Sequence, residues 1–208
     1  LIAILFNVSV FADYSNHKDS KEVIDELVNE HGFEESYVIN VLKQAKKRKT
    51  ALNSVARPAE KTKTWDDYRA IFLKKKRISD GKKFIQNNIT VLERAEKEFG
   101  VPKEVITAIL GVETDYGNIM GSYRVIDSLT TLGFDDPRRS KFFKSELIQF
   151  FILTRENNLD ILKVKGSYAG AMGYGQFISS SYRAYAIDFD GDGYVDLFNS
   201  LEDAIGST

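Results

Sequence analysis

Apolar residues recur at helical spacing along most of the chain, and little of the sequence alternates as a strand would. Val23, Ile24 and Leu27 share one face of a helix that Asp19 or Ser20 can cap. The same spacing predicts further helices over residues 34–47, 81–99, 101–114 and 139–156. The pattern therefore predicts a mainly α fold without internal repeats.

Two features lie between the helices predicted over residues 34–47 and 81–99. Residues 50–63 are polar and contain Pro58, which predicts a linker. Thr64 opens a Thr-Trp-Asp-Asp sequence that resembles a capping box and predicts a helix carrying Tyr68. We therefore expect an N-terminal helical region with its linker over residues 13–63 and a second region over residues 64–208.

The first twelve residues are apolar and end in small side chains. Val10 and Ala12 suit the small-residue rule for cleavage before Asp13, so residues 1–12 are predicted to be the remnant of an export signal. The stretch is too short to span a bilayer, and a buried N-terminal strand is the alternative. Because the first residue is Leu, we expect the chain to be a fragment.

Composition excludes several classes of protein. The 208 residues are 43% hydrophobic and 12% aromatic, which is enough to build a core and excludes global disorder. A net charge of -1 gives no general attraction to nucleic acid or to anionic membranes. The basic runs at residues 46–49 and 74–77 predict solvated helix faces, with contact to an anionic polymer such as the cell wall as the alternative. The absence of cysteine excludes disulfides and thiolate metal sites.

Glu113 is the first residue that indicates chemistry. On the helix predicted over residues 101–114 it shares a face with the apolar Ile106 and Leu110. A carboxyl group on such a face is desolvated, which raises its pKa and suits it to act as a general acid on a glycosidic bond. The alternative is a glutamate at a helix end that faces solvent. Gly111 and Gly117 flank it, as if a ligand or backbone approached closely.

Residues 166–177 combine glycines with aromatic, hydroxyl and amide side chains. Sugar rings are apolar on their faces and polar on their rims, so aromatic faces beside such polar groups suit them. A tight structural turn is the alternative. The candidate sugar-binding side chains of this segment are Ser167, Tyr174, Gln176 and Phe177.

An aspartate-rich loop near the end of the chain matches the calcium loop of an EF-hand. Carboxylates at loop positions 1, 3 and 5 and a backbone carbonyl at position 7 come from Asp188, Asp190, Asp192 and Tyr194. Position 12 is Asn199, so a later carboxylate, Glu202 or Asp203, is expected to close the loop. An Asx-rich turn is the alternative, although three such close carboxylates repel one another without a cation. We expect structural calcium and no organic cofactor.

Residues 137–139, Pro-Arg-Arg, lie at the start of a predicted helix and are a weaker indication of ligand binding. The guanidinium groups of Arg138 and Arg139 could bind carboxylates of stem peptides or sugar oxygens, and surface arginines are the alternative. His17 and His31 are expected to be isolated, with no Ser-His-Asp or metal-histidine spacing.

Together these residues resemble the B-type lytic murein transglycosylases, both soluble and membrane-bound. The resemblance extends from about Trp65 to the end and rests on residues 111–114 (Gly-Val-Glu-Thr), 137–139, 169–177 and the aspartate-rich loop. It implies a mainly α, lysozyme-like (goose-type) catalytic core with an EF-hand-like calcium loop and an additional N-terminal helical region. It also implies that residues 64–208 are an incomplete catalytic region, since family members continue further.

The resemblance implies that Glu113 is the catalytic residue of a carbon–oxygen lyase acting on polysaccharide. The enzyme would cleave the β-1,4 bond between N-acetylmuramic acid and N-acetylglucosamine and leave a 1,6-anhydromuramic acid end. The matching groove positions are Tyr68, Arg138, Arg139, Ser167 and Gln176. The alternatives are a muramidase that uses water, a non-catalytic peptidoglycan-binding protein and a calcium-responsive module.

The resemblance also indicates where the protein acts. Without the lipid-attachment cysteine of membrane-bound members, we expect a soluble, exported, periplasmic monomer that is associated with the cell wall. Its expected partners are peptidoglycan glycan strands and other cell-wall enzymes, with no nucleic acid and no transmembrane segment.

Overall fold

Amphipathic helices build nearly all of the structure, a computed structural model that describes residues 13–57 and 63–208. The predicted signal remnant and Pro58 lie outside these residues. The helices are α1 (Ser20–Asn29), α2 (Glu35–Gln44), α3 (Lys49–Ala56), α4 (Trp65–Phe72), α5 (Lys75–Asn87), α6 (Ile89–Phe99), α7 (Lys103–Thr114), α8 (Val125–Asp135), α9 (Ser140–Glu156), α10 (Ser179–Tyr185) and α11 (Leu201–Ser207), preceded by a 3-10 turn, η1 (Tyr14–Asn16). The mainly α fold predicted from the sequence is confirmed.

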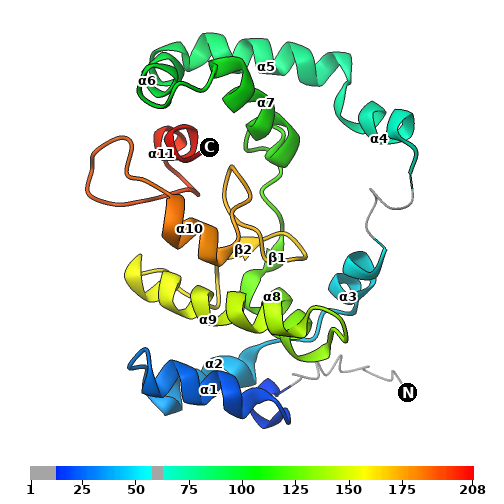
Figure 1. The fold of residues 1–208 in the computed structure, drawn as a ribbon, viewed down its shortest axis with the longest axis vertical. Coiled ribbons are helices and arrows are strands. Elements are labelled where there is room, and N and C mark those ends of the chain that lie inside the picture. Colours follow the sequence, from blue (N-terminus) through cyan, green and yellow to red (C-terminus); the bar gives the residue numbers. More distant parts are fainter. Residues whose placement is uncertain (1–12, 58–62) are drawn as a thin grey trace, which may run out of the picture.

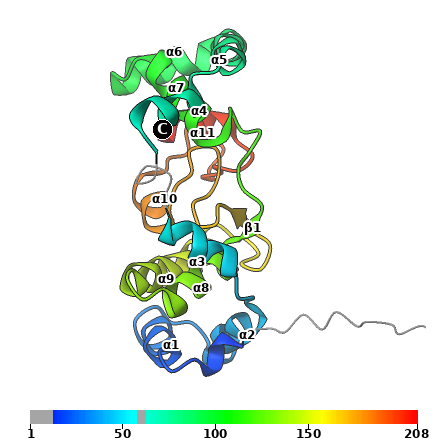
Figure 2. The same cartoon turned by 90° about the vertical axis from the view of Figure 1, so that its right-hand side faces the viewer.

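The helices form an open arc along the long axis of the molecule (Figure 1). Helices α1 and α2 lie at one end beside α9, and α5, α6 and α7 lie at the other (Figures 1 and 2). Between them are α10, α11 and a small antiparallel pair of strands, β1 (Tyr123–Arg124) and β2 (Lys165–Gly166), with Tyr123 opposite Gly166.

Within residues 13–57 and 63–208, two separate hydrophobic clusters hold the helices together. The larger one joins α1, α2 and α3 to α8 and α9, with Leu27, Leu42, Leu129 and Phe151 among its buried side chains. The smaller one joins α5, α6 and α7 to the end of the chain. The larger cluster thus takes side chains from both sides of the predicted boundary at residues 63 and 64, and the division at that boundary stays a prediction.

The structure corrects two of the helix predictions made from the sequence. Residues 49–56 form α3 and are not a linker, because Ala51 is fully buried and Leu52 and Val55 pack against the larger cluster. The helix predicted over residues 81–99 is two helices that meet at Asn88. The Asn88 side chain donates a hydrogen bond to the Phe84 carbonyl at 2.8 Å, which competes with the regular helical pattern.

Across the described residues, no helix combines the length and the apolar content that crossing a bilayer requires.

The first basic run contributes to the fold as well as to the surface. Arg48 and Arg124 both bind the carboxylate of Asp127, which is fully buried, with shortest distances of 2.6 Å each. The backbone N–H of Lys46 donates to the same carboxylate at 2.9 Å. Lys47 pairs with Asp135 at 3.2 Å. The prediction that this run is simply a solvated face is therefore wrong, because these contacts tie the start of α3 to α8.

We expect Asp127→Ala to lower the free energy of unfolding by about 3–5 kcal/mol, since it leaves two guanidinium groups without their buried partner. Urea denaturation followed by circular dichroism measures the change. Asp25→Ala is the matched control, because Asp25 forms only an exposed ion pair with Lys21 and should cost less than about 1 kcal/mol. Equal losses for the two variants would contradict the prediction.

Candidate functional site

Glu113 lies in the last turn of α7. Pro102 directly precedes this helix and Glu104 lies in its first turn. Ile106 and Leu110 are buried, whereas Glu113 is exposed, so the predicted sharing of the buried face is wrong. Partial desolvation by the surrounding protein still raises the pKa of the Glu113 carboxyl group. No hydrogen bond or ion pair joins this carboxylate to another described residue, so it is a free carboxyl group biased toward its protonated form.

The turn after Glu113 has an unusual backbone conformation that other contacts stabilise. Asp115 and Tyr116 are consecutive non-glycine residues with φ of 53° and 62°, which is energetically costly unless the surroundings fix it. Arg77 Nε donates to the Asp115 carboxylate at 3.2 Å, and the Tyr116 hydroxyl donates to the Arg77 carbonyl at 2.9 Å. Asp115 is therefore an ion-paired structural carboxylate, while Glu113 is not paired.

The glycines beside Glu113 make room for tyrosine rings. A Cβ atom on Gly111 would come within 2.7 Å of the Tyr116 ring, and one on Gly117, where φ is +89°, within 2.0 Å of the Tyr174 ring. The close approach expected from the sequence is confirmed, but side chains occupy the space where a ligand or backbone was expected. These contacts hold Tyr174 against the segment that follows Glu113.

The glycine-rich segment contacts the end of α7 through polar groups as well. Thr114 Oγ1 donates to the Tyr174 carbonyl at 2.8 Å. Gln176, with φ of 51°, donates from Nε2 to the Met120 carbonyl at 3.2 Å. Tyr174 and Gln176, predicted as sugar-binding residues, are thus brought to the end of α7 and the loop that follows it.

Ser167 and Phe177 shape this segment from within. Ser167 Oγ accepts hydrogen bonds from the backbone N–H groups of Ala169 at 3.3 Å and Ala171 at 3.0 Å. Phe177 pairs with Met172 through two backbone hydrogen bonds, and its ring packs against the larger cluster. Their contact with a sugar stays a prediction, and their structural contacts support a positioning role.

The two arginines before α9 lie on a different part of the structure. The backbone N–H groups of Arg138 and Arg139 donate to Asp136 Oδ1 at 2.7 and 2.9 Å. Both side chains are exposed, and the Arg139 guanidinium lies 4.5 Å from the centre of the Phe142 ring. Among the described residues, no hydrogen bond or ion pair links either arginine to α7 or to residues 166–177.

Tyr68 lies on α4, whose N-terminus is capped as predicted by Thr64 Oγ1, which accepts from the Asp67 N–H at 3.3 Å. Its ring contacts those of Trp65 and Phe72, with centres 6.4 and 5.3 Å away. Trp65 is 72% exposed. Helix α4 therefore presents an aromatic surface, and its contact with a glycan stays a prediction.

The aspartate-rich loop gathers three carboxylates. Oxygen atoms of Asp188, Asp190 and Asp192 all lie within 4.8 Å of one another. A hydrogen bond from the Ser200 hydroxyl at 2.6 Å lowers the pKa of the Asp190 carboxyl group. Three hard oxygen ligands this close suit calcium, with the Tyr194 carbonyl as the predicted fourth ligand.

The residues predicted to close this loop lie outside the three-carboxylate group. Asp203 is fully buried, and its carboxylate accepts backbone hydrogen bonds from Phe189 at 2.7 Å, Asp190 at 3.1 Å and Asp196 at 2.8 Å. Glu202 pairs with Arg94 at 3.0 Å. Asp203 therefore anchors the loop backbone, and direct ligation of calcium by either residue stays a prediction.

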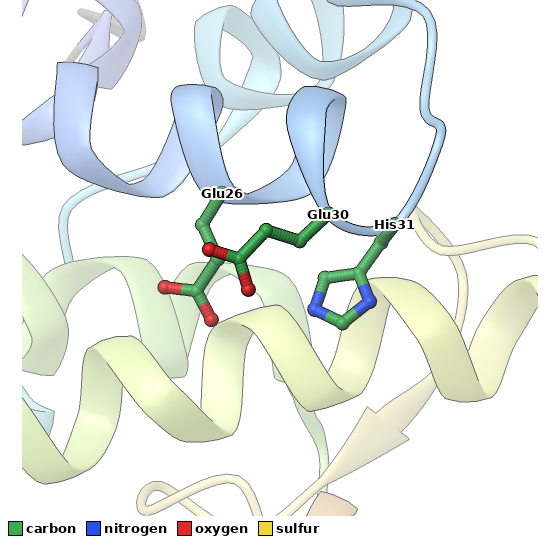
Figure 3. Close-up of side chains that lie close together, drawn as sticks. All are labelled: Glu26, Glu30 and His31. Atoms are coloured by element: carbon green, nitrogen blue, oxygen red, sulfur yellow. The ribbon is translucent and has the colours of Figure 1, made fainter.

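A second group of ligand-type side chains lies at the end of α1. Glu26, Glu30 and His31 each offer an atom within 4.8 Å of the others, and Figure 3 shows their side chains, from α1 and the turn after it, pointing toward α9. The expectation that His31 is isolated is therefore wrong. Glu26 and Glu30 are one helical turn apart, but the return of the chain after α1 could not be predicted from spacing alone. Among the residues that the structure describes, nothing else indicates an ion at this surface group.

The family described as "Transglycosylase SLT domain" matches residues 15–208. Membrane-bound lytic murein transglycosylase B of Escherichia coli (strain K12) is 41% identical over 204 residues, which are 94% of this chain and 56% of that protein. The chain thus spans little more than half the length of this relative.

Solved structures agree with this match. Catenated lytic transglycosylase SltB1 of Pseudomonas aeruginosa superposes with a TM-score of 0.88 at 46% identity, over 94% of this chain and 64% of that one. Escherichia coli lytic transglycosylase Slt35 in complex with calcium superposes with a TM-score of 0.87 at 39% identity, over 100% of this chain and 66% of that one. The lysozyme-like helical fold implied by the sequence motifs is confirmed.

Proposed function

The chain belongs to the transglycosylase SLT domain family, and from this we propose that it cuts peptidoglycan glycan strands by transglycosylation. The proposed bond is the β-1,4 link between N-acetylmuramic acid and N-acetylglucosamine. The proposed enzyme is a carbon–oxygen lyase that acts in the periplasm, where glycan strands are its main partner and other cell-wall enzymes are further partners.

The observation that carries the proposal is the state of Glu113. It is a carboxyl group with a raised pKa and no ionic partner among the described residues. Its neighbour Asp115 is ion-paired with Arg77 at 3.2 Å, which makes it a weaker base than an unpaired carboxylate. One unpaired carboxyl group beside a paired one supports a mechanism in which a single residue is acid first and base afterwards.

In the proposed reaction Glu113 donates its proton to the glycosidic oxygen as the bond to the muramic acid C1 breaks. The leaving N-acetylglucosamine departs with a new hydroxyl group. The ionised Glu113 then accepts the proton of the muramoyl 6-hydroxyl, whose oxygen bonds to C1. Glu113 ends protonated, and the product has a 1,6-anhydro ring without the addition of water.

The surrounding side chains have proposed roles in binding the glycan. Tyr174 and Gln176 lie on the segment that contacts the end of α7, so they are proposed to contact the sugars nearest Glu113. Ser167 and Phe177 would hold this segment in shape. Tyr68, Arg138 and Arg139 are proposed to bind more distant parts of the strand or its peptides. Analysis of the ends formed from purified peptidoglycan tests the whole proposal.

We propose that calcium binds to Asp188, Asp190, Asp192 and the Tyr194 carbonyl, as supported by the gathered carboxylates. The ion would offset their repulsion and fix the loop, and it takes no part in bond cleavage. This role is structural because Glu113 supplies the chemistry without a metal.

Calcium should therefore raise the melting temperature, and a chelator should lower it. Binding to the folded state alone adds about 2.7 kcal/mol when free calcium is a hundredfold above its dissociation constant. Differential scanning calorimetry measures the difference, which Asp188→Asn should reduce. Glu30→Gln, in the other ligand-type group, is the control and should keep the full response. Identical melting temperatures with calcium and with chelator would contradict the prediction.

A further inference from the structure

One cavity lies at the end of the molecule formed by α1, α2 and α9, away from the end formed by α5, α6 and α7 (Figure 1). It has a volume of about 500 Å³ and lies between the turn joining α1 to α2 and the C-terminal end of α9. Its walls include Phe33, Glu34, Tyr37, Arg155 and Asn158. This volume falls within the ~300–1,000 Å³ typical of small-molecule sites. The cavity is large enough to hold a ligand, and its chemistry indicates which kind.

A rigid aromatic group forms one part of the cavity. The rings of Phe33 and Tyr37 are stacked, with centres 6.2 Å apart and planes 11° apart. Phe151 packs edge-on against both rings, at 84° and 88°. Tyr37 remains 42% exposed, while Phe33 is buried. The Tyr37 ring is therefore fixed before any ligand arrives, which limits the entropy lost when a ligand binds to it.

The Arg155 guanidinium reinforces this aromatic group. It lies 4.1 Å from the centre of the Phe33 ring and donates to the His31 carbonyl at 2.7 Å. Arg155 is thus held in the cavity wall by a cation–π contact and a hydrogen bond. Glu34 supplies one negative charge to the same wall, so the charged groups balance. This balance favours a neutral ligand over an anionic polymer.

Free polar groups surround the aromatic ring. The Tyr37 hydroxyl, the Glu34 carboxylate and the Asn158 amide make no hydrogen bond to another described residue. Asn158 has φ of 50° in the turn after α9, where the backbone is fixed by a hydrogen bond from the Leu159 N–H to the Thr154 carbonyl at 2.8 Å. A phenol, a carboxylate and an amide can donate to and accept from the hydroxyl groups of a pyranose.

We propose that this cavity is a second glycan-binding site, which takes neutral N-acetylhexosamine rings on Tyr37 and is separate from the site at Glu113. An aromatic ring suits the apolar face of a pyranose, and Glu34 and Asn158 suit its polar rim. Such a site would hold a glycan strand at the opposite end of the molecule from α7 (Figure 1). The inference rests on the cavity alone, and it stands or fails independently of any cleavage by Glu113.

A local fluorescence titration tests the site directly. The chain has one tryptophan, Trp65 on α4, so Trp65→Phe combined with Tyr37→Trp places the sole tryptophan in the cavity. Addition of chitotetraose, a neutral β-1,4-linked N-acetylglucosamine oligomer, should change its emission in a saturable way. Polyethylene glycol of similar mass should not. No saturable change with chitotetraose, or the same change with both compounds, would overturn the proposal.

Calorimetric titration then tests the role of the ring in chitotetraose binding. Tyr37→Ala in a Glu113→Gln background should weaken one binding event by about tenfold or more, as expected for loss of an aromatic anchor. Tyr185→Ala is the matched control, because Tyr185 is 71% exposed on α10, and it should bind as the parent does. Unchanged affinity in Tyr37→Ala overturns the proposal.

Asn158→Gly provides a second variant should Tyr37→Ala unfold, because glycine adopts the positive φ of this position without strain. It removes an exposed amide that makes no side-chain hydrogen bond to the described residues, and it should weaken the same binding event several-fold. Unchanged binding in a folded Asn158→Gly protein would overturn the proposed role of the polar rim. If these titrations succeed while the protein leaves peptidoglycan uncut, the second site holds and the function proposed for Glu113 fails.

Discussion

Glu113→Gln is expected to lower the rate of peptidoglycan cleavage by about 10²–10⁴-fold or more, with the fold unchanged. Glutamine keeps the shape of the side chain but cannot donate a proton to the glycosidic oxygen or accept one from the 6-hydroxyl. Because one group serves both steps, the loss should reach or exceed the upper part of this range. Release of soluble muropeptides from purified peptidoglycan measures the rate, and circular dichroism measures the fold.

Glu104→Gln is the matched control for this variant. Glu104 lies on the same helix as Glu113, its side chain is 65% exposed, and its one ionic contact is with Lys103 at 3.9 Å. It should retain the activity and the melting temperature of the wild type. A Glu113→Gln variant that cleaves at a rate near that of wild type would show that Glu113 is not the acid.

The raised pKa of Glu113 also sets the direction of the pH dependence. The acid must be protonated to act, so the wild-type rate should fall as pH rises through this raised pKa. Desolvation also makes the pKa of Glu113 higher in the folded protein than in the unfolded chain. The free energy of unfolding should therefore fall as pH rises through this raised pKa. The Glu104→Gln variant should show the same decline in rate as the wild type.

Amphipathic spacing predicted the helices that have one buried face. Residues 20–29 and 140–156 were found because apolar side chains such as Val23 and Phe143 recur on the side that packs. Helix α8 was missed because residues 125–134 are all buried, which leaves no polar face to mark the period. Helix α3 was missed because only half of its eight residues are apolar and mostly polar residues follow it, so its packing against α8 is what distinguishes it from a linker.

Contacts between distant segments account for what the sequence could not predict about the candidate site. The sequence motifs identified Glu113, Tyr174 and Gln176 as candidates. Hydrogen bonds from Thr114 and Gln176 join the end of α7 and the loop after it to the glycine-rich segment. Glu113 is exposed because of the way the chain turns away after α7 ends at Thr114, and the spacing of apolar residues does not predict that turn. The ion pair of Asp115 depends on Arg77, a residue that the sequence presents only as part of a basic run.

The ends formed from peptidoglycan distinguish transglycosylation from hydrolysis, and we expect 1,6-anhydromuramic acid ends. In either reaction the proposed acid is Glu113, but the two reactions differ in which oxygen then attacks C1. A hydrolase must hold a water molecule, usually with a second carboxylate in a defined place. The nearest carboxylate in sequence, Asp115, is bound to Arg77 and fixed in a left-handed turn. We therefore expect the nucleophile to be the one that the substrate carries itself.

The muramoyl 6-hydroxyl belongs to the same sugar as C1, so holding that sugar against Tyr174 and Gln176 raises the effective concentration of the nucleophile. The new ends should be lighter by one water than hydrolysed ends and should resist reduction by borohydride, as mass spectrometry before and after treatment will show. Peptidoglycan digested by a hydrolytic lysozyme is the control, because its new muramic acid ends are reducible. If borohydride reduces every new muramic acid end formed by this protein, then water is the nucleophile and the protein is a muramidase.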